Sequence, residues 1–191
     1  MSDRIAAAIQ RLEHFMTTVE DAHALPRDAA AFVHAMVLAT RATRVVEIGT
    51  SYGYSALWIA SALAEQGSDG APGRLVTIDH DKRKTDAARG NVADAGLDGY
   101  VECRTGTALD VLRDVAAPID LVLNDADKAH CIEYVTSLAG KLRDRGVVLT
   151  DNTVTHADQL AEFVCWVRDR DDFFSTHVPI GNGMEMSVKV T

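Results

Sequence analysis

The stretch "RVVEIGTSYGYSALWIASALAEQ", residues 44–66, combines the two patterns that decide the fold. Its first part, "RVVEIG", is a short β-branched run typical of a buried strand, and its last part, "YSALWIASALAEQ", has the length and apolar spacing of a helix. Gly49 and Gly53 lie at the junction between the two parts. A strand that turns through glycine into a helix begins a βαβ unit, so parallel strands are expected.

The same alternation continues along the chain. Further strand-like runs are "RLVTID" (74–79), "YVECRTG" (100–106), "IDLVLND" (119–125) and "RGVVLTD" (145–151), and helical patterns cover 82–96, 108–115 and 131–144. The glycine-rich segment 65–74 is expected to be an exposed turn between a helix and a strand. Together these patterns predict an α/β fold, with a mostly parallel sheet covered by helices on both faces.

The two ends of the chain differ from its middle. Residues 2–40 have helical patterns, with a break before Pro26, which is expected to start a second helix. After a helical pattern at 157–171, "FFSTHVPIGNGMEMSVKVT" predicts two strands joined by the turn "GNG", which would add an antiparallel edge to the sheet. We expect a single domain overall, in which the helices of 1–40 pack on or extend a core formed by 41–191.

The composition limits the classes of function. The chain has 191 residues, 47% hydrophobic and 25% charged, which suits one globular domain. Its net charge of −9 and the lack of a basic cluster argue against nucleic acid or an anionic membrane as the main partner. The first residues do not resemble a secretory signal, and no window approaches the roughly 20 apolar residues of a membrane span. Three widely spaced cysteines without a C-x-x-C pair favour a reducing cytoplasm over a disulfide framework or a zinc site.

The glycine turn and the end of the next strand suggest a nucleoside ligand. Gly49 and Gly53 have the spacing G-x-x-x-G, so the dinucleotide fingerprint G-x-G-x-x-G is not met. Asp79 ends the strand at 74–79, where a carboxylate commonly binds the ribose hydroxyls in nucleoside-binding α/β folds. Taken separately, the turn could be a tight connection without a ligand, and Asp79 could be a solvated loop acid.

Polar side chains also follow the two later strands. Asp125 and Asp127 follow the strand at 119–125, and Asp151 and Asn152 follow the strand at 145–151. If these strands are neighbours, Asp125, Asp151 and Asn152 converge, and their hard oxygen atoms suit Mg²⁺, Mn²⁺ or Ca²⁺. The alternative is that these acids cap the following helices. Asp127 in particular fits a cap or an ion-pair partner.

Lys128 is the candidate catalytic base. Beside a metal ion and a substrate hydroxyl, its side chain could take a proton or stabilise a developing oxyanion. The alternative is an ordinary exposed lysine. We assign no ligand role to His14, His23 or His34, which are expected in the terminal helices.

These motifs together resemble the cation-dependent O-methyltransferases of the catechol and caffeoyl-CoA type. The resemblance covers roughly residues 30–191 and depends on "VVEIGTSYGYSALWIA", "LVTIDHD", "GTALDVL", "DLVLNDADK", "GVVLTDN" and "VPIGNGMEMS", which occur in the family's order and spacing. It implies a Rossmann-like class I methyltransferase fold, with a seven-stranded, mostly parallel sheet whose last strand is antiparallel. The D-A-D-K stretch paired with a downstream D-N is its most specific part.

The resemblance also implies roles for individual residues. The residues expected to bind S-adenosylmethionine are Glu47, Gly49, Tyr54, Ser55, Asp79, Ala108 and Asp125. Within this set, Asp79 would bind the ribose, Ala108 would lie near the adenine, and the residues of 47–55 would line the methionine part. Asp125, Asp151 and Asn152 would hold the divalent cation, with Mg²⁺ preferred, and Lys128 and Asp125 would form the catalytic set. His156 lies where the family often has a histidine and is expected at a helix start or a cavity rim.

The implied function is therefore transfer of a methyl group from S-adenosylmethionine to a small hydroxylated, catechol-like acceptor, by a homodimer. A coenzyme A thioester is the least supported acceptor, because no basic set for its phosphates is evident. Two alternatives stay open. A nicotinamide-dependent (NAD) oxidoreductase would require the absent G-x-G-x-x-G turn, and a non-catalytic nucleoside- or metal-binding module would have lost its activity.

Overall fold

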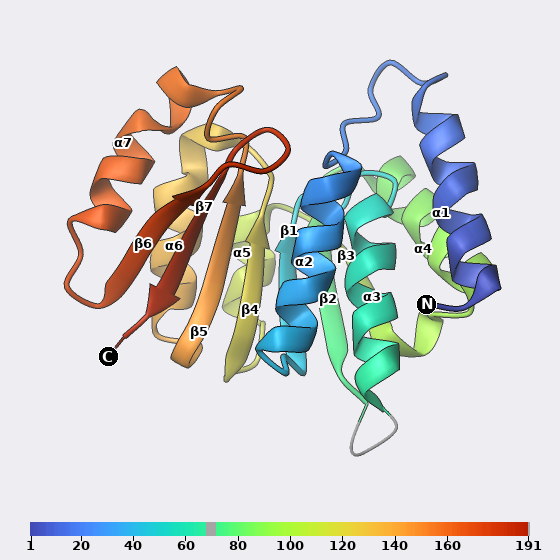
Figure 1. Cartoon of the computed structure of the whole chain (residues 1–191), viewed down its shortest axis with the longest axis horizontal. Coiled ribbons are helices and arrows are strands. Elements are labelled where there is room, and N and C mark those ends of the chain that lie inside the picture. Colours follow the sequence, from blue (N-terminus) through green and yellow to red (C-terminus); the bar gives the residue numbers. More distant parts are fainter. Residues whose placement is uncertain (68–71, 191) are drawn as a thin grey trace.

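The computed structural model describes residues 1–67 and 72–190. The helices are α1 (Asp3–Met16), α2 (Arg27–Ala39), α3 (Tyr54–Gln66), α4 (Lys82–Ala95), α5 (Ala108–Arg113), α6 (Cys131–Ala139) and α7 (Ala157–Arg168), with short 3₁₀ turns η2 (Asp98–Tyr100) and η3 (Lys128–His130). The strands are β1 (Arg44–Ile48), β2 (Arg74–Asp79), β3 (Val101–Thr105), β4 (Ile119–Asn124), β5 (Leu142–Asp151), β6 (Phe173–Val178) and β7 (Met184–Lys189). Figure 1 shows these elements along the chain.

All seven strands form one sheet, in the order β3-β2-β1-β4-β5-β7-β6. The pairs from β3 to β5 are parallel, whereas β7 runs antiparallel to both β5 and β6. The order reverses between β1 and β4, which is the position at which open α/β sheets bind ligands beyond the ends of their strands. The predicted seven-stranded, mostly parallel sheet with an antiparallel last strand is confirmed.

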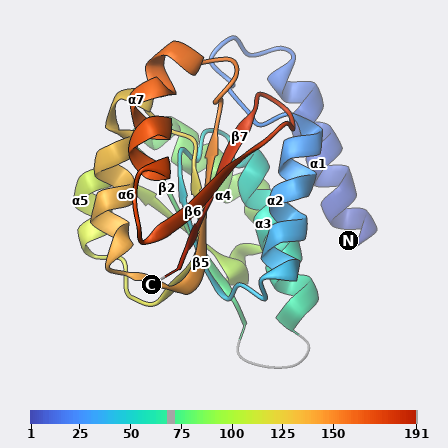
Figure 2. The same ribbon diagram turned by 60° about the vertical axis from the view of Figure 1, so that its left-hand side comes forward.

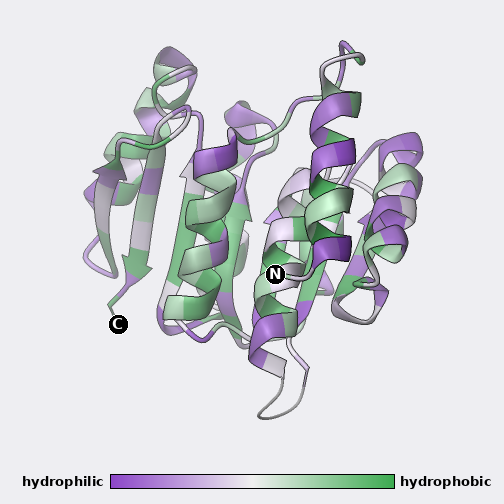
Figure 3. Ribbon diagram, turned by 45° about the vertical axis from the view of Figure 1, so that its right-hand side comes forward, coloured by the Kyte–Doolittle hydropathy of each residue, from purple (hydrophilic) through white to green (hydrophobic). Residues whose placement is uncertain are grey.

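Alternating side chains on the central strands divide the interior into two layers. Leu121 and Leu123 of β4 pack with the cluster that includes α1 to α4, while Val122 packs with the cluster of α5, α6 and α7. Figure 2 shows these two groups of helices on opposite sides of the sheet, and Figure 3 shows that the strands between them are mostly hydrophobic. A strand buried on both faces becomes an uninterrupted apolar run, which explains the sequence "IDLVL".

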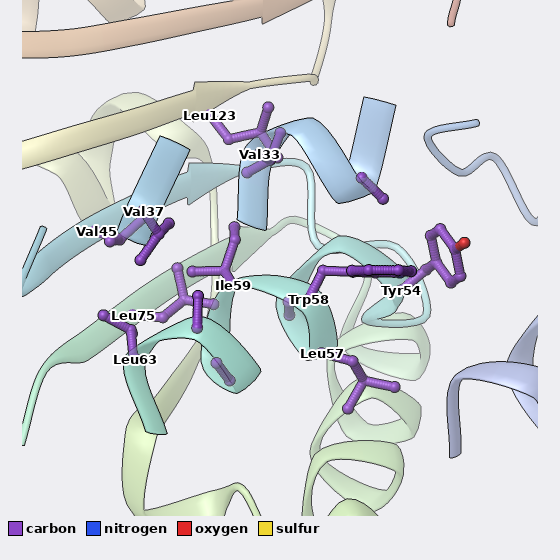
Figure 4. Packing of buried hydrophobic residues seen from close by; sticks show 14 of the residues in the cluster. Val33, Val37, Val45, Tyr54, Leu57, Trp58, Ile59, Leu63, Leu75 and Leu123 are labelled. Atoms are coloured by element: carbon purple, nitrogen blue, oxygen red, sulfur yellow. The ribbon is translucent and has the colours of Figure 1, made fainter. Parts of the chain in front are cut away.

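Helix α3 packs against β2 of the sheet and beside α2. Figure 4 shows Ile59 and Leu63 of α3 near Val33 and Val37 of α2 and Leu75 of β2. Ten consecutive residues of α3, from Tyr54 to Leu63, are buried. The first turn of this helix is therefore held firmly at the end of β1, where the glycine turn lies.

One predicted helix boundary is wrong. The helical pattern at 131–144 predicts a helix through Asp144, but α6 ends at Ala139 and β5 begins at Leu142. Leu142 continues the i+4 spacing of Leu138, so periodicity alone extends the helix. In the structure Leu142 instead pairs with Ile119 of β4, before a register irregularity in that pairing. Of the turn predicted at 65–74, residues 68–71 lie outside the described residues.

Within the described ranges, no helix has both the length and the apolar character that crossing a membrane requires. Cys103, Cys131 and Cys165 are free thiols. The homodimer and the cytoplasmic location stay predictions.

Candidate active site

A cavity of about 1270 Å³ lies at the carboxyl ends of the parallel strands. Its lining includes residues from the ends of five strands, and it contains seven of the predicted site residues: Gly49, Asp79, Ala108, Asp125, Lys128, Asp151 and Asn152. Residues up to a hundred positions apart in the chain therefore meet in one place, as the rule for parallel sheets predicts.

Gly49 lets the first turn approach the end of β4. Its φ is +106°, a left-handed conformation that favours glycine, and a Cβ there would lie 2.2 Å from the carbonyl oxygen of Asp125. The amide of Asp125 in turn donates to the carbonyl of Ile48 at 2.9 Å. The turn after β1 and the start of the D-A-D-K stretch are thus in direct backbone contact, which a side chain at position 49 would disrupt.

Asp79 is held rigidly at the cavity wall. Its two carboxylate oxygens accept the backbone amides of Ser51 at 2.8 Å and Asp81 at 2.9 Å, and its side chain is only 11% exposed. Each carboxylate oxygen can accept a further hydrogen bond. Asp79 is therefore a fixed acceptor for hydroxyl groups of a ligand in the cavity.

Glu47 is fully buried in β1, behind the lining of the cavity. Its Oε2 accepts the hydroxyl of Thr77 at 2.5 Å, while Oε1 has no hydrogen-bond partner among the described residues. Burial raises the pKa of Glu47 to about 7, against the opposing effect of hydroxyl groups beside it. Ser55, in the first turn of α3, is also buried and does not line the cavity.

The structure does not bring Tyr54 to the cavity. The Tyr54 hydroxyl donates to Glu13 of α1 at 2.7 Å, and its ring packs edge-on against Trp58 (Figure 4). It lines a separate pocket of about 390 Å³ beside α1. Tyr54 thus contacts the N-terminal helix and lines a different pocket from the predicted cofactor-binding residues that line the cavity.

The predicted carboxylate set converges because β4 and β5 are paired neighbours. Asn124 lies beside Thr150, so Asp125 and Asp151 come next to each other at the sheet edge. Asp151 is 1% exposed, and neither of its carboxylate oxygens has a hydrogen-bond partner among the described residues. Burial, followed by the negative charge of Asp125, raises the pKa of Asp151 to about 6. A buried carboxylate without a partner is costly, so this arrangement favours a bound cation.

Lys128 and Asp127 have different environments, although they are adjacent. Lys128 donates from Nζ to Oδ1 of Asp125 at 2.9 Å, and both side chains are largely buried, 12% and 22% exposed. Asp127 is exposed. It caps η3 by accepting the amide of Ala129 at 3.1 Å, and it pairs with His130 at 2.9 Å, which confirms the predicted cap and ion-pair role.

The donor set fits a divalent cation of the Mg²⁺ type. In the described part of the chain, no group of three or more His, Cys, Asp and Glu side chains is placed to hold a metal. The predicted set has only two such residues, Asp125 and Asp151, with the amide of Asn152 beside them. Carboxylate and amide oxygens suit Mg²⁺, which usually keeps several waters and takes few protein ligands.

Sequence patterns missed several residues that line the cavity. His23 was expected in a terminal helix, but it lies in the segment 17–26 between α1 and α2 and reaches the cavity rim. The sequence pattern predicts Asn182 only as part of a hairpin turn, but in the structure Asn182 also lines the cavity. No local motif marks either residue, because only the packing of distant elements brings them there. His156 lines the rim at the start of α7, as expected.

Comparison with known proteins gives consistent matches. Residues 46–153 match the family model of a methyltransferase domain. A catechol O-methyltransferase of Mycobacterium tuberculosis is 36% identical over 148 residues, which are 74% of this chain and 64% of that protein, so the chain spans less than two thirds of its relative.

Two solved structures have the same architecture. The O-methyltransferase from Bacillus cereus in complex with SAH has a TM-score of 0.82 and 25% identity, covering 99% of this chain and 91% of that chain. The O-methyltransferase TomG from Streptomyces achromogenes in complex with SAM also has a TM-score of 0.82, with 28% identity over 100% of this chain and 91% of that chain.

These matches confirm the resemblance to O-methyltransferases of the catechol type. The family model covers more than half of the sequence, including the glycine turn, Asp79 and the two carboxylate ends. The chain therefore belongs to the methyltransferase-domain family.

Proposed function

We propose that this protein transfers a methyl group from S-adenosylmethionine to a hydroxyl of a small catechol-like acceptor, with a divalent cation held by Asp125, Asp151 and Asn152. The observation that carries the proposal is Asp151, a fully buried carboxylate whose oxygens accept no hydrogen bond from the described residues, at the side of a cavity that also contains Asp125 and Lys128. The relatives that bind SAM or SAH support the choice of cofactor.

The cofactor would occupy the half of the cavity above β1, β2 and β3. Asp79 would accept the two ribose hydroxyls, and Ala108 at the start of α5 would lie against the adenine. Oε1 of Glu47, which has no partner among the described residues, is available to the ammonium of the methionine part, directly or through a water. Gly49 and Ser55 belong to the same region, whereas Tyr54 would support it only through α1.

The reactive half would lie above β4 and β5. A bound divalent cation supplies charge that lowers the pKa of a chelated hydroxyl and fixes two vicinal oxygens. Lys128 would hold the developing oxyanion or take the hydroxyl proton, and its ion pair with Asp125 keeps its side chain at the cavity. S-adenosylmethionine would supply the activated methyl group, whose carbon–sulfur bond would break as the new oxygen–carbon bond forms.

Calorimetric titration tests the cofactor and separates the alternatives. We expect SAH to bind and NAD not to bind, with Mg²⁺ present, because the turn lacks G-x-G-x-x-G. Binding of NAD in place of SAH would support the oxidoreductase alternative. Binding of SAH without methyl transfer to any of a panel of catechols would support the non-catalytic alternative.

Substitution of Asp125 tests the cation and the reaction together. We expect Asp125→Ala to abolish Mg²⁺-stimulated methyl transfer to catechol while the far-ultraviolet circular dichroism stays that of the wild type. The loss should exceed about a hundredfold, because one change removes a cation ligand and the partner of Lys128. If Asp125→Ala, with a chelator present, keeps the turnover that the wild type has with Mg²⁺, the metal site is ruled out.

A further inference from the structure

Three segments that are distant in the chain complete the lining of the cavity, and we treat the part of the cavity that they share as one end. The segment 17–26 contributes Ala22, His23 and Ala24, and the turn between β6 and β7 contributes Asn182. The third segment is the start of α7, with Thr155, His156 and Gln159. If the cofactor lies above β1 to β3, as proposed, this end is left for the acceptor, and we call it the acceptor end.

The turn between β6 and β7 is fixed in place by its neighbours. The carbonyl of Asn182 accepts the amides of Val154 at 2.9 Å and Thr155 at 3.2 Å. The amide of Gly181 donates to Asp28 of α2 at 3.2 Å, and a Cβ at Gly181 would lie 2.8 Å from that of Ala29. The turn therefore joins the start of α2 to the start of α7, and it closes one side of the acceptor end.

The segment 17–26 is anchored on both sides of His23. Before it, Asp21 accepts the hydroxyl of Tyr52 at 2.9 Å and the guanidinium of Arg83, and its carbonyl accepts Nζ of Lys84 at 2.9 Å. After it, Leu25 is 4% exposed in the main core. His23 itself is exposed at the cavity rim. Because the residues on both sides of it are anchored, its backbone has little freedom.

The side chains of the acceptor end are small or polar. Among the described residues that line it, the three segments contribute two alanines, threonine, glutamine, asparagine and two histidines, and no Phe, Tyr, Trp or branched aliphatic side chain. A wide apolar ring system would find little hydrophobic surface there. Hydrogen-bond donors, by contrast, are available from the imidazoles and from the amides of Gln159 and Asn182.

The carboxylates that line the cavity all lie outside the three segments of the acceptor end, which bears on the sign of the charge that this end can accept. Asp79 accepts backbone amides, Asp110 pairs with Arg113 at 2.9 Å, Asp125 pairs with Lys128, and Asp127 pairs with His130. The remaining one, Asp151, is buried. Among the described residues, the three segments therefore contribute no carboxylate that could pair with a substrate ammonium, while His23 and His156 offer imidazole N–H groups to an anion.

We infer that the acceptor is a catechol that carries an anionic substituent, such as a carboxylate, and that His23 is a specificity-determining residue that contacts this substituent. The inference rests on the proposed function, because it assumes that the cofactor and the two vicinal oxygens occupy the rest of the cavity. A catechol acid places its anion away from Asp125 and Asp151, toward the imidazoles of the rim. A catecholamine would place an ammonium where only imidazoles and neutral amides are available.

The test compares three acceptors of similar size: 3,4-dihydroxybenzoate, unsubstituted catechol and dopamine. With Mg²⁺ and S-adenosylmethionine present, kcat/KM should be highest for the acid and lowest for the amine. In His23→Ala the ratio of kcat/KM between acid and catechol should fall about threefold to fivefold, the size of one exposed hydrogen bond to a charged group, through a higher KM for the acid. His14→Ala, which removes an exposed imidazole from α1 outside the cavity, is the matched control and should leave this ratio unchanged.

Binding measured without turnover separates this inference from the proposed function. Titration of the SAH- and Mg²⁺-loaded protein should give tighter binding of the acid than of dopamine, and His23→Ala should reduce the difference. If the acid is bound selectively but no acceptor is methylated, the acceptor site stands and the proposed activity fails. If the protein methylates dopamine as well as the acid, or if His23→Ala and His14→Ala give the same ratios, the inference is wrong.

Discussion

Glu47 and Asp151 are both buried carboxylates with oxygen atoms that accept no hydrogen bond from the described residues. Burial raises the pKa of each, to about 7 and about 6, which means that the folded protein without ligands holds these groups at an energetic disadvantage once they ionise. Such groups are retained where a ligand supplies the missing partner. The two residues lie at the two halves of the cavity, one on the proposed cofactor side and one on the proposed cation side.

The ionisation of Glu47 gives a prediction on stability. Its pKa is raised in the folded state, so the folded protein binds a proton that the unfolded chain has lost between pH 4.5 and about 7. The contribution of this group to stability is therefore full below pH 4.5 and is lost as the pH rises through 7. Glu47→Gln removes this pH-dependent contribution. The free energy of unfolding of the variant minus that of the wild type should therefore increase with pH in that range, by up to about 1.4 kcal/mol per pH unit.

Urea denaturation of the ligand-free proteins between pH 5 and 7.5 measures this difference. Glu162→Gln, on the exposed side of α7, is the matched control and should remain parallel to the wild type. If the proposed function holds, Glu47→Gln should also weaken SAH binding about tenfold, the effect of losing one hydrogen bond to a charged group. Stability curves of Glu47→Gln and wild type that run parallel across this pH range would contradict the account of Glu47.

Among the elements, the β6–β7 hairpin links parts of the molecule that are distant in sequence. Asp151 pairs with Met184 at the end of β5, and the ladder continues as the amide of Thr153 donates to the carbonyl of Gly183 at 3.0 Å. Beyond it, the turn contacts the start of α2. The residues after Asn152 are therefore positioned by the hairpin as well as by β5.

Gly181→Ala should loosen this link. The residue has a φ of +54°, and a Cβ would also lie 3.1 Å from Pro26, so strain of about 1–3 kcal/mol is expected from the backbone conformation alone. We expect faster hydrogen exchange at the amides of Val154 and Thr155, which donate to Asn182, while the amides of β1 and β2 exchange as before.

Gly140→Ala is the matched control for this experiment. Its φ is −73° and a Cβ there would meet no atom within 4 Å, so exchange at Val154 and Thr155 should not change. Equal protection of these amides in Gly181→Ala and in the wild type would show that the hairpin turn does not hold the start of α7.

For the whole molecule, the sequence predicts most of the fold and seven residues of the cavity lining, but not the segments that complete its rim. The parallel strands and the glycine turn were predictable because burial on both faces imposes apolar runs, and because the ends of parallel strands meet at one edge. The end of α6 was not, because Leu142 satisfies a helical spacing and a strand pairing equally well. Tyr54 was predicted at the cofactor but contacts α1, and His23 was predicted in a terminal helix but lines the cavity. The reason is similar, because only the packing of α1 and the segment 17–26 decides which side chain faces the cavity.

Binding of a divalent cation should stabilise the whole molecule, because the site joins β4 to β5 at the centre of the sheet. At a Mg²⁺ concentration a hundred times Kd, the stabilisation would be about 2.7 kcal/mol, which corresponds to a rise in Tm of about 5–10 °C for a chain of this size. Asp151→Asn removes the buried charge without changing the shape of the side chain, so the variant should lose this response while remaining folded without Mg²⁺.

Asp127→Asn is the matched control, because this exposed residue keeps its ability to cap η3 and lies outside the cation set. Thermal unfolding followed by circular dichroism, with Mg²⁺ and with EDTA, measures the response. A rise in Tm that is the same in Asp151→Asn as in Asp127→Asn would place the cation elsewhere and leave the buried carboxylate unexplained.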